Sequence, residues 1–481
     1  MATPIPTNHA SLDARAAAEA AEGRIVVASG GRIARGVTTD SRAVAPGCAF
    51  VALRGERHDG HDYVHAAIDA GAVLVIVESG RAPGGPNRAD VVEVADTLQA
   101  WGAIARAHLR AWRNANRAAR VAAITGSAGK TTTKEFCSAI LRAVAPCHAT
   151  RGNLNNRVGV PAVVLQVEPS TRFLVLEMGM SVPGELAALA ALAEPDVGAI
   201  TNIGLAHAGG VGGSIDDVAR EKGSLFEGLG RGGVAIANAD DPAVVRELRR
   251  APSARVVTFG SAEGSDYRLL ARRSLGADGS IVEVRRPAGT SAFRVPLAGH
   301  DAAVDFVAAL AIAEAAACGP LADDGVVAAL GTVSPIAGRM HVRRLRGDVL
   351  LIDDTYNASP AAMRAALATL AECGERRRVA ILGEMKELGA SATEQHALLG
   401  RAVADAGVAL LVSCGGLADV VARAAERRGV AVVFAEDARD AGLLAVDRVR
   451  PGDALLVKAS RSVGAERAVE ALVSARGEEV P

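Results

Sequence analysis

At 481 residues the chain is too long for one hydrophobic core, and about three domains of ~100–200 residues each are expected. Because 53 Lys and Arg balance 54 Asp and Glu, the composition excludes a strongly basic surface for nucleic acid or an anionic membrane. The six cysteines lack C-x-x-C spacing, and neither a signal peptide nor a membrane-spanning stretch is recognisable. We therefore expect a soluble, cytoplasmic protein with no nucleic-acid partner, no zinc site and no membrane insertion.

The N-terminal region, residues 1–112, alternates short apolar strands (RIVVA, CAFVAL, VLVIV, VVEV) with polar turns and one helical stretch at residues 63–70. This pattern predicts a small α/β domain. Its turns contain Asp40-Ser41-Arg42, the segment ALRG and the segment DGHD, which offer hydroxyls, an Arg and Gly-flanked backbone. Such residues suit the binding of a sugar nucleotide diphosphate, but they are also common in ordinary surface turns. Taken alone, these segments favour ordinary surface turns. The polar stretch 110–117 is interpreted as a linker.

The most informative stretch is residues 121–136, VAAITGSAGKTTTKEF, in which an apolar run is followed by glycines and then by helical spacing. It predicts a strand, a phosphate-binding loop and a helix. Gly126 and Gly129 lack a Cβ, so the backbone N–H groups can turn toward a phosphate at the positive end of the helix. Lys130 is expected to reach the β- and γ-phosphates, and the Thr131 hydroxyl to coordinate Mg²⁺. The general motif requires Gly at position 124, where Ile stands, so the context supports a nucleoside triphosphate over a plain Gly-rich turn.

The central region, residues 113–335, alternates strands (FLVLE, VGAIT, GVAIANA, RVVTFG) with helical stretches, which predicts a mostly parallel sheet covered by helices. Ligands bind beyond the carboxyl ends of such strands. Glu177 closes one strand, His207 follows another, and Lys222 lies in a helical stretch at residues 216–226. Each alone is usually a surface or packing residue. Beside the phosphate loop, however, Glu177 and His207 would be placed to hold a second Mg²⁺.

After residue 335 the pattern restarts with VLLIDD, a helix at 360–370, and the strands VAILGEM, ALLVSCG, VAVVFAE and ALLVKAS. This predicts a C-terminal Rossmann-like α/β domain over residues 336–481. The fold class is thus α/β, with a small N-terminal domain, a central phosphate-loop domain and a Rossmann-like domain.

Taken together, these segments resemble the Mur ligase family over nearly the whole chain. The family's phosphate loop has the short form TGSAGKTTTKE, so the Ile at position 124 is no departure. The resemblance also identifies the first domain as the family's uridine-nucleotide domain, in spite of the ambiguity of its turns. The segments that carry the resemblance further are GNLNN, EMGMS, TNI, NADD, GRM, DDTYNASP, LGEM and VKASR, in order along the chain.

The resemblance implies an ATP-dependent ligase of peptidoglycan synthesis. ATP would phosphorylate the terminal carboxylate of UDP-N-acetylmuramoyl-tripeptide, and the amine of D-alanyl-D-alanine would attack the acyl phosphate to give an amide, ADP and phosphate. We also expect a monomer. The alternatives are the preceding ligase, which adds diaminopimelate or lysine, folylpolyglutamate synthase, and a non-catalytic nucleotide-binding scaffold. The segments DDTYNASP and LGEMKELG and the lack of a DNPR-like motif oppose the first, and the N-terminal domain opposes the second. The presence of Glu177, His207 and Lys222 with Lys130 opposes the third.

The resemblance also assigns residues. Two Mg²⁺ ions are implied, with Thr131 at the first and Glu177 and His207 at the second. Lys222 falls where similar ligases carry a lysine carbamylated by CO₂. The implied catalytic residues are Lys130, Lys222 and His207. The implied ATP-binding residues are Gly126, Ser127, Ala128, Gly129, Lys130, Thr131, Thr132, Arg339 and Asp354, and the implied UDP-substrate-binding residues are Asp40, Ser41, Arg42, Asn153 and Asn156.

Three positions depart from the family pattern. In the adenine segment, Asp305 stands where Asn is expected and Asp301 where His is expected, and an ionised Asp accepts hydrogen bonds but cannot donate them. Ser224 stands two residues after Lys222, where many relatives carry Glu. The adenine contacts and the carbamate site are therefore expected to differ in detail from those of the relatives.

Overall fold

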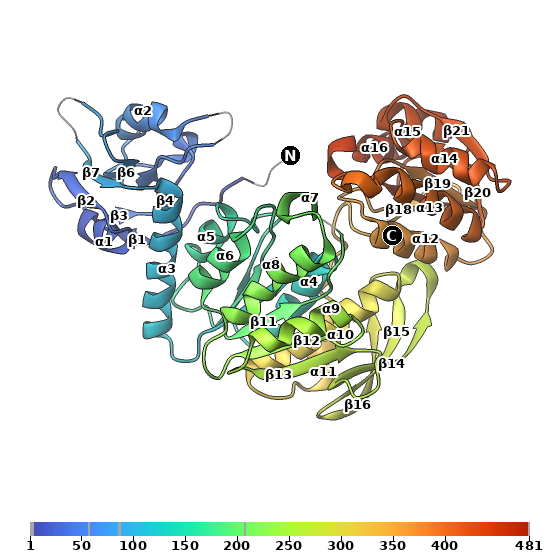
Figure 1. Ribbon diagram of the computed structural model, residues 1–481, viewed down its shortest axis with the longest axis horizontal. Coiled ribbons are helices and arrows are strands. Elements are labelled where there is room, and N and C mark those ends of the chain that lie inside the picture. The colour runs from blue at the N-terminus through green and yellow to red at the C-terminus, as the bar shows by residue number, and fades with distance from the viewer. Residues whose placement is uncertain (1–3, 56–57, 85–87, 206–207, 480–481) are drawn as a thin grey trace.

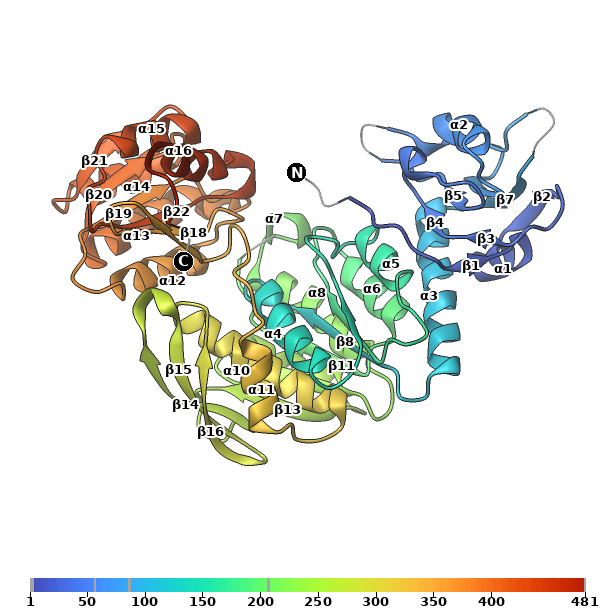
Figure 2. The same cartoon turned by 180° about the vertical axis from the view of Figure 1, so that it is seen from behind.

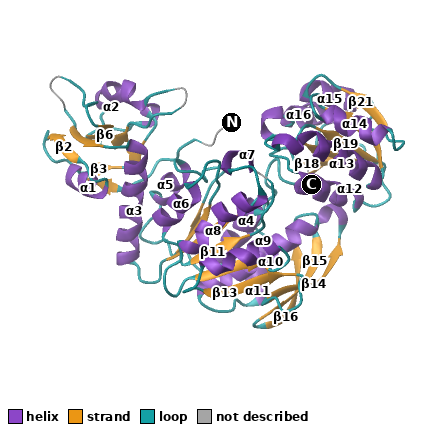
Figure 3. Ribbon diagram, in the orientation of Figure 1, coloured by secondary structure: helices purple, strands orange, loops and turns teal. Residues whose placement is uncertain are grey.

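The computed structural model describes residues 4–55, 58–84, 88–205 and 208–479. Within these residues, three α/β units follow one another, each on its own main sheet of five, nine and six strands (Figure 1). Figure 3 shows helices covering all three sheets. The predicted fold class of three α/β domains is confirmed, whereas the boundaries after residues 112 and 335 stay predictions. In the part of the chain described, no helix is both long and apolar enough to cross a membrane.

The N-terminal unit has a sheet in the order β2-β7-β6-β5-β4, in which only β2 pairs antiparallel with its neighbour. The expected helical stretch at 63–70 is present as a 3₁₀ turn followed by α2. The elements are β1 Ser11–Leu12, α1 Ala14–Ala20, β2 Arg24–Val27, β3 Ala34–Arg35, β4 Val37–Thr38, η1 Ser41–Ala43, β5 Ala49–Val51, η2 Gly60–Tyr63, α2 Val64–Asp69, β6 Leu74–Glu78, β7 Asp90–Val94 and α3 Thr97–Ala115.

Helix α3 runs along the side of the central unit (Figure 2). Its buried face carries Trp101 and Trp112, whose indole N–H groups donate to backbone carbonyls of the central unit at 2.9 and 3.0 Å. The prediction of a linker over residues 110–117 is therefore wrong for residues 110–115, which are the end of helix α3. The stretch is polar on the outside, but it continues a helix whose apolar stripe packs on the next unit.

The central sheet has the order β16-β15-β14-β13-β12-β11-β8-β10-β9, parallel from β9 to β14 and antiparallel over β14, β15 and β16. The expectation of a mostly parallel sheet is confirmed. The elements are β8 Arg120–Thr125, α4 Lys130–Arg142, β9 Cys147–Ala149, α5 Gly159–Val164, β10 Phe173–Glu177, α6 Glu185–Ala193, β11 Val197–Ile200, α7 Ala208–Val211, α8 Ile215–Glu227, β12 Val234–Asn238, α9 Pro242–Glu247, η3 Leu248–Arg250, β13 Arg255–Gly260, β14 Tyr267–Ser274, η4 Gly276–Asp278, β15 Ser280–Arg286, β16 Gly289–Val295, α10 His300–Ala317 and α11 Asp323–Leu330.

Helices α4 and α10 pack together on one face of this sheet. Helix α10 is apolar on nearly all sides, as expected for a helix buried between a sheet and other helices. Phe306 on α10 contacts Phe136 on α4 edge-to-face, with ring centroids 5.9 Å apart. This packing brings the first turns of α10 beside the start of α4.

The C-terminal sheet has the order β17-β18-β22-β19-β20-β21, with only β17 antiparallel. The end of the β14–β15 hairpin lies beside α12 (Figure 2). There the guanidinium of Arg272, on β14, pairs with Glu372, just after α12 (Nη1 to Oε1, 2.9 Å). The elements are β17 His341–Leu345, β18 Val349–Asp353, α12 Pro360–Ala371, β19 Arg378–Leu382, η5 Gly389–Ser391, α13 Ala392–Asp405, β20 Val408–Ser413, α14 Ala418–Glu426, β21 Ala431–Phe434, α15 Ala438–Val446, β22 Ala454–Lys458, η6 Arg461–Val463 and α16 Glu466–Arg476.

Candidate functional site

The predicted phosphate loop has the expected form, with strand β8 ending at Thr125 and helix α4 beginning at Lys130. Its two glycines have positive φ, +154° at Gly126 and +79° at Gly129. Both also lie too close to neighbours for a side chain. A Cβ at Gly126 would be 1.9 Å from Thr201 Oγ1, and one at Gly129 would be 2.2 Å from Asp305 Oδ1. The loop thus requires glycine at both positions for conformation and for space.

The end of the adjacent strand β11 fixes the shape of the loop. Thr201 Oγ1 donates to the carbonyl of Ala128 at 2.6 Å, and the N–H of Ala128 donates to Asn202 Oδ1 at 2.8 Å. The N–H of Ser127 donates to the carbonyl of Asn202 at 3.0 Å. Thr201 and Asn202 appeared in the sequence only as part of a family motif, without a role. Their contacts show that they hold the backbone of Ser127 and Ala128 in place.

Lys130, Thr131 and Glu177 meet beside the loop. Lys130 Nζ donates to the carbonyl of Gly126 at 2.7 Å, and Thr131 Oγ1 donates to Glu177 Oε2 at 2.9 Å. The other oxygen of Glu177, which is only 1% exposed, accepts a hydrogen bond from Asn155 at 2.8 Å. Burial lowers the pKa of Lys130, while the Glu177 charge opposes this shift. Sequence reasoning had placed these three residues together.

Two oxygen donors, the Thr131 hydroxyl and the Glu177 carboxylate, fit Mg²⁺, which takes few protein ligands and completes its shell with water and phosphate oxygens. Among the described residues, no group of three or more His, Cys, Asp or Glu side chains is arranged so that it could hold a metal ion. His207, the third predicted metal ligand, lies outside the described residues.

Lys222 lies on α8 in the wall of the same cavity and is 1% exposed. Burial, and then the nearby Lys130 cation, lower its pKa well below the ordinary value, and Glu221 only partly offsets them. The Lys222 amine makes no hydrogen bond to any residue that the structure describes. Ser224, the departure two residues on, donates back to the carbonyl of Arg220 in its own helix at 3.4 Å. Lys222 is thus a buried amine in the wall of the phosphate site, and its pKa is lowered toward the neutral form.

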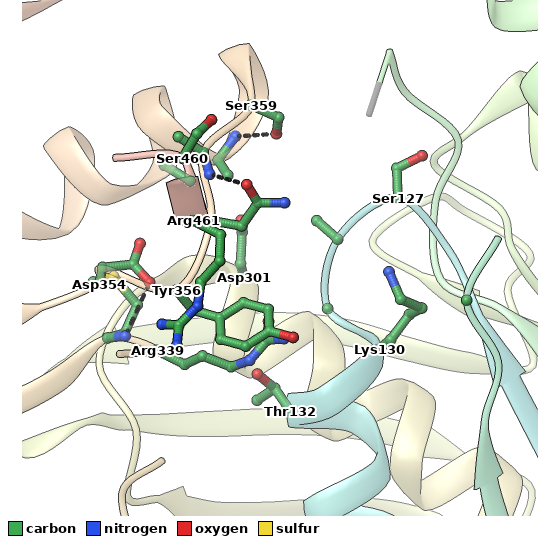
Figure 4. Close-up of a pocket in the computed structure, with 18 of the residues that line it drawn as sticks. Ser127, Lys130, Thr132, Asp301, Arg339, Asp354, Tyr356, Ser359, Ser460 and Arg461 are labelled. Carbon is green, nitrogen blue, oxygen red and sulfur yellow. Dashed lines mark hydrogen bonds between the residues drawn. The ribbon is translucent and has the colours of Figure 1, made fainter. Parts of the chain in front are cut away.

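The C-terminal unit supplies the opposite wall (Figure 4). The guanidinium of Arg339 lies 3.9 Å from the centroid of the Tyr356 ring, and that of Arg461 lies 5.7 Å from it. Asp354 accepts a hydrogen bond from Lys458 Nζ at 2.5 Å. Arg339 and Asp354 were predicted here, whereas Tyr356, Lys458 and Arg461 were not. These three stand in the motifs DDTYNASP and VKASR, which were the only signal in the sequence.

Asp301 and Asp305 lie one turn apart on α10 and both line the cavity. Asp305 is 7% exposed and accepts a hydrogen bond from Thr133 Oγ1 at 3.3 Å. Burial, and then the Asp301 charge, raise the pKa of Asp305 well above the ordinary value, against the smaller effects of Thr133, Arg339 and Lys130. The raised pKa favours the protonated carboxyl, which can donate a hydrogen bond, whereas the sequence-based expectation assumed an ionised Asp.

Together these residues enclose a cavity of about 600 Å³ between the central and C-terminal units. Asn153 and Asn156 line it, whereas the other predicted substrate residues, Asp40, Ser41 and Arg42, do not. The latter lie at the 3₁₀ turn η1 in the N-terminal unit, which Asp40 caps. There Arg42 Nη2 pairs with Asp40 Oδ2 at 2.7 Å and lowers the pKa of Asp40. The structure therefore divides the predicted site residues between two regions.

The chain matches three family descriptions: "Mur ligase family, catalytic domain" at residues 34–109, "Mur ligase middle domain" at 124–313 and "Mur ligase, glutamate ligase domain" at 338–461. It is 34% identical over 443 residues to UDP-N-acetylmuramoyl-tripeptide--D-alanyl-D-alanine ligase of Escherichia coli (strain K12), covering 91% of this chain and 93% of that protein. The structure of MurF from Acinetobacter baumannii is similar with a TM-score of 0.86 at 29% identity, covering 98% of this chain and 100% of that one. MurF ligase from Thermotoga maritima in complex with ADP has a TM-score of 0.80 at 28% identity, covering 91% and 97%.

Proposed function

Because this chain belongs to the Mur ligase family, we propose that it joins D-alanyl-D-alanine to UDP-N-acetylmuramoyl-tripeptide and cleaves ATP to ADP and phosphate. The product is the UDP-linked pentapeptide used for peptidoglycan. The observation that carries the proposal is that the phosphate loop and cations of another unit line one shared cavity. ATP and a UDP-linked precursor are cytoplasmic compounds, which supports a cytoplasmic location, and we propose a monomer.

The first step brings a carboxylate to a triphosphate, and these two anions repel each other. Lys130 supplies a fixed positive charge at the loop, and Arg339 supplies another from the opposite wall. The N–H groups of the first turn of α4 lack partners within the helix and add donors for phosphate oxygens. These groups stabilise the charge that develops as the phosphoryl group moves to the carboxylate.

Thr131 would hold one Mg²⁺, and Glu177, with His207, a second. Bound there, Mg²⁺ would neutralise charge on the phosphate oxygens. The role of Glu177 is supported by its burial and by the two hydrogen bonds that orient its carboxylate, from Thr131 and Asn155.

In the second step the amine nitrogen of the dipeptide attacks the carbonyl carbon of the acyl phosphate. The C–N bond forms, the C–O bond to phosphate breaks, and the nitrogen loses a proton. The amine must therefore arrive neutral. Because the phosphate loop occupies one wall, we propose that the dipeptide enters along the C-terminal wall, which carries Lys386, Ser460 and Arg461.

Lys222 is proposed to carry a carbamate. A neutral amine can add to CO₂ and an ammonium cannot, and burial of Lys222 lowers its pKa and so favours the neutral form. The carbamate would be an anion and would be attracted to the nearby Lys130 cation. An unmodified, protonated Lys222 would repel both Lys130 and a nearby divalent cation.

The UDP part of the substrate is proposed to bind at Asp40, Ser41 and Arg42, in the N-terminal unit. Asn153 and Asn156 would contact the part of the substrate that enters the cavity. The location of both asparagines in the cavity wall supports this division.

A substrate panel tests the proposal. With MgATP and UDP-N-acetylmuramoyl-tripeptide, ADP release is expected when D-alanyl-D-alanine is added. In the control reaction, diaminopimelate replaces D-alanyl-D-alanine as the amine substrate. UDP-N-acetylmuramoyl-dipeptide replaces UDP-N-acetylmuramoyl-tripeptide as the carboxylate substrate. Turnover only in the control would assign the preceding ligase instead, and turnover in neither reaction would favour a non-catalytic scaffold.

A further inference from the structure

The segment after β19, residues 383–388, forms part of the C-terminal wall of the cavity, and we call it the 383–388 loop. Lys386, Glu387 and Leu388 line the cavity. The backbone of Glu387 has φ of +64°, a conformation that costs a non-glycine residue energy and persists only when the surroundings impose it. The loop therefore needs contacts that fix its path.

His396 on α13 supplies the first of these contacts. Its side chain is fully buried, and it does not line the cavity. The N–H of Met385 donates to His396 Nε2 at 2.9 Å, and Nδ1 lies 2.6 Å from the carbonyl of Ala392. A carbonyl only accepts, so Nδ1 carries the proton, and a backbone N–H only donates, so Nε2 is bare. The partners thus fix the neutral Nδ1–H tautomer.

The second contact joins the loop to the segment after β22. The N–H of Lys386 donates to Ser460 Oγ at 2.8 Å, and the N–H of Ser460 donates to the carbonyl of Glu384 at 3.1 Å. Ser460 is 3% exposed and is followed by Arg461, which faces the cavity. The loop is therefore held on one side by the imidazole and on the other by Ser460.

We propose that His396 is a positioning residue for the amine substrate. It acts through the backbone of Met385, holding Lys386 and its neighbours in the wall along which that substrate enters. This inference rests on the proposed ligase function, which defines that substrate. ATP binding depends on a different set of groups, the phosphate loop and Arg339. Substitution of His396 should therefore raise the KM for the amine substrate more than the KM for ATP.

Two variants separate this role from simple packing. In His396→Gln the longer side chain extends to the position of Nε2 and can accept from the Met385 N–H. In His396→Asn the side chain ends near Nδ1 and leaves that N–H without an acceptor. The matched control is His108→Asn, since His108 on α3 bonds a backbone carbonyl at 3.1 Å but does not line the cavity.

The experiment measures KM for the dipeptide and for ATP, thermal unfolding, and amide hydrogen exchange at Met385 and Lys386. For His396→Asn we expect the dipeptide KM to rise about tenfold or more, the ATP KM to stay within about twofold, and both amides to exchange faster. His396→Gln should restore all three values. His108→Asn should change only the unfolding temperature.

Equal changes in both KM values, or changes like those of His108→Asn, would overturn the positioning role. So would unchanged amide exchange in His396→Asn. If the wild-type protein shows no ligase activity, the proposed function fails, whereas the exchange measurement still decides whether His396 holds the loop.

Discussion

Gly129→Ala probes the geometry of the phosphate loop most directly. The backbone of Gly129 has φ of +79°, so any L side chain there costs about 1–2 kcal/mol. The new Cβ would lie 2.2 Å from Asp305 Oδ1 and 3.0 Å from its Cγ, so the whole carboxyl must move. Such overpacking costs about 1–3 kcal/mol, and the hydrogen bond from Thr133 to Asp305 is lost at about 1 kcal/mol.

Gly232→Ala is the matched control, because Gly232 has φ of +81° and no heavy atom lies within 4 Å of the position that an added Cβ would take. It should carry only the backbone cost. The expected difference in unfolding free energy between the variants is about 2 kcal/mol or more. If the loop must regain its wild-type shape to hold the phosphates, MgATP binding bears the same cost of about 2 kcal/mol or more. Affinity for MgATP then falls about thirtyfold or more in Gly129→Ala and is unchanged in Gly232→Ala.

Denaturant unfolding gives the stabilities, and titration calorimetry gives the MgATP affinities. If Gly129→Ala unfolds like Gly232→Ala and binds MgATP with wild-type affinity, the contact between the loop and Asp305 does not shape the nucleotide site.

The remaining predictions concern three ionisable side chains of the cavity. Lys130→Ala should lower the rate of ADP formation by at least about 10²–10³-fold, because the phosphates lose their fixed cation, and normal turnover would remove Lys130 from the mechanism. Lys222→Ala should lose activity, with partial recovery when short carboxylic acids are added, and should lack the carbamate ¹³C resonance that wild-type protein gives with ¹³CO₂. A wild-type spectrum without that resonance would refute the carbamate. For Asp305, burial and the Asp301 charge raise the folded-state pKa, so the folded protein keeps a proton that the unfolded chain loses above about pH 4. Wild-type stability should therefore fall as pH rises from there toward the folded-state pKa. Asp305→Asn should abolish this slope in urea unfolding and should be the more stable protein at pH 7. Parallel slopes in both proteins would contradict the raised pKa of Asp305.

The sequence predicted best where a local pattern and its chemistry coincide. The order of strand, glycines, Lys130 and helix predicted the phosphate loop, and the polar end of the strand FLVLE predicted that Glu177 would lie beside it. Both follow from the topology of parallel sheets, whose strand ends meet at one edge. The division into three α/β units was likewise visible in the alternation of strands and helices.

Other features depend on contacts between distant segments. The stretch at 110–117 was misread because its composition is polar, although the burial of Trp112 makes it helical as far as Ala115. The raised pKa of Asp305 arises mainly from its burial where α10 packs on α4, which no local pattern encodes. The cations that face the phosphate loop come from a different unit, so only the folded chain shows that they share one cavity.

The central claim is that the γ-phosphoryl group of ATP is transferred to a substrate carboxylate before the amide forms. Tripeptide substrate labelled with ¹⁸O in its terminal carboxylate tests this claim, with mass spectrometry of the phosphate released in the presence of MgATP and D-alanyl-D-alanine. The account predicts one ¹⁸O atom in each released phosphate and none in ADP. Unlabelled phosphate accompanying amide formation, or label found in AMP, would contradict it.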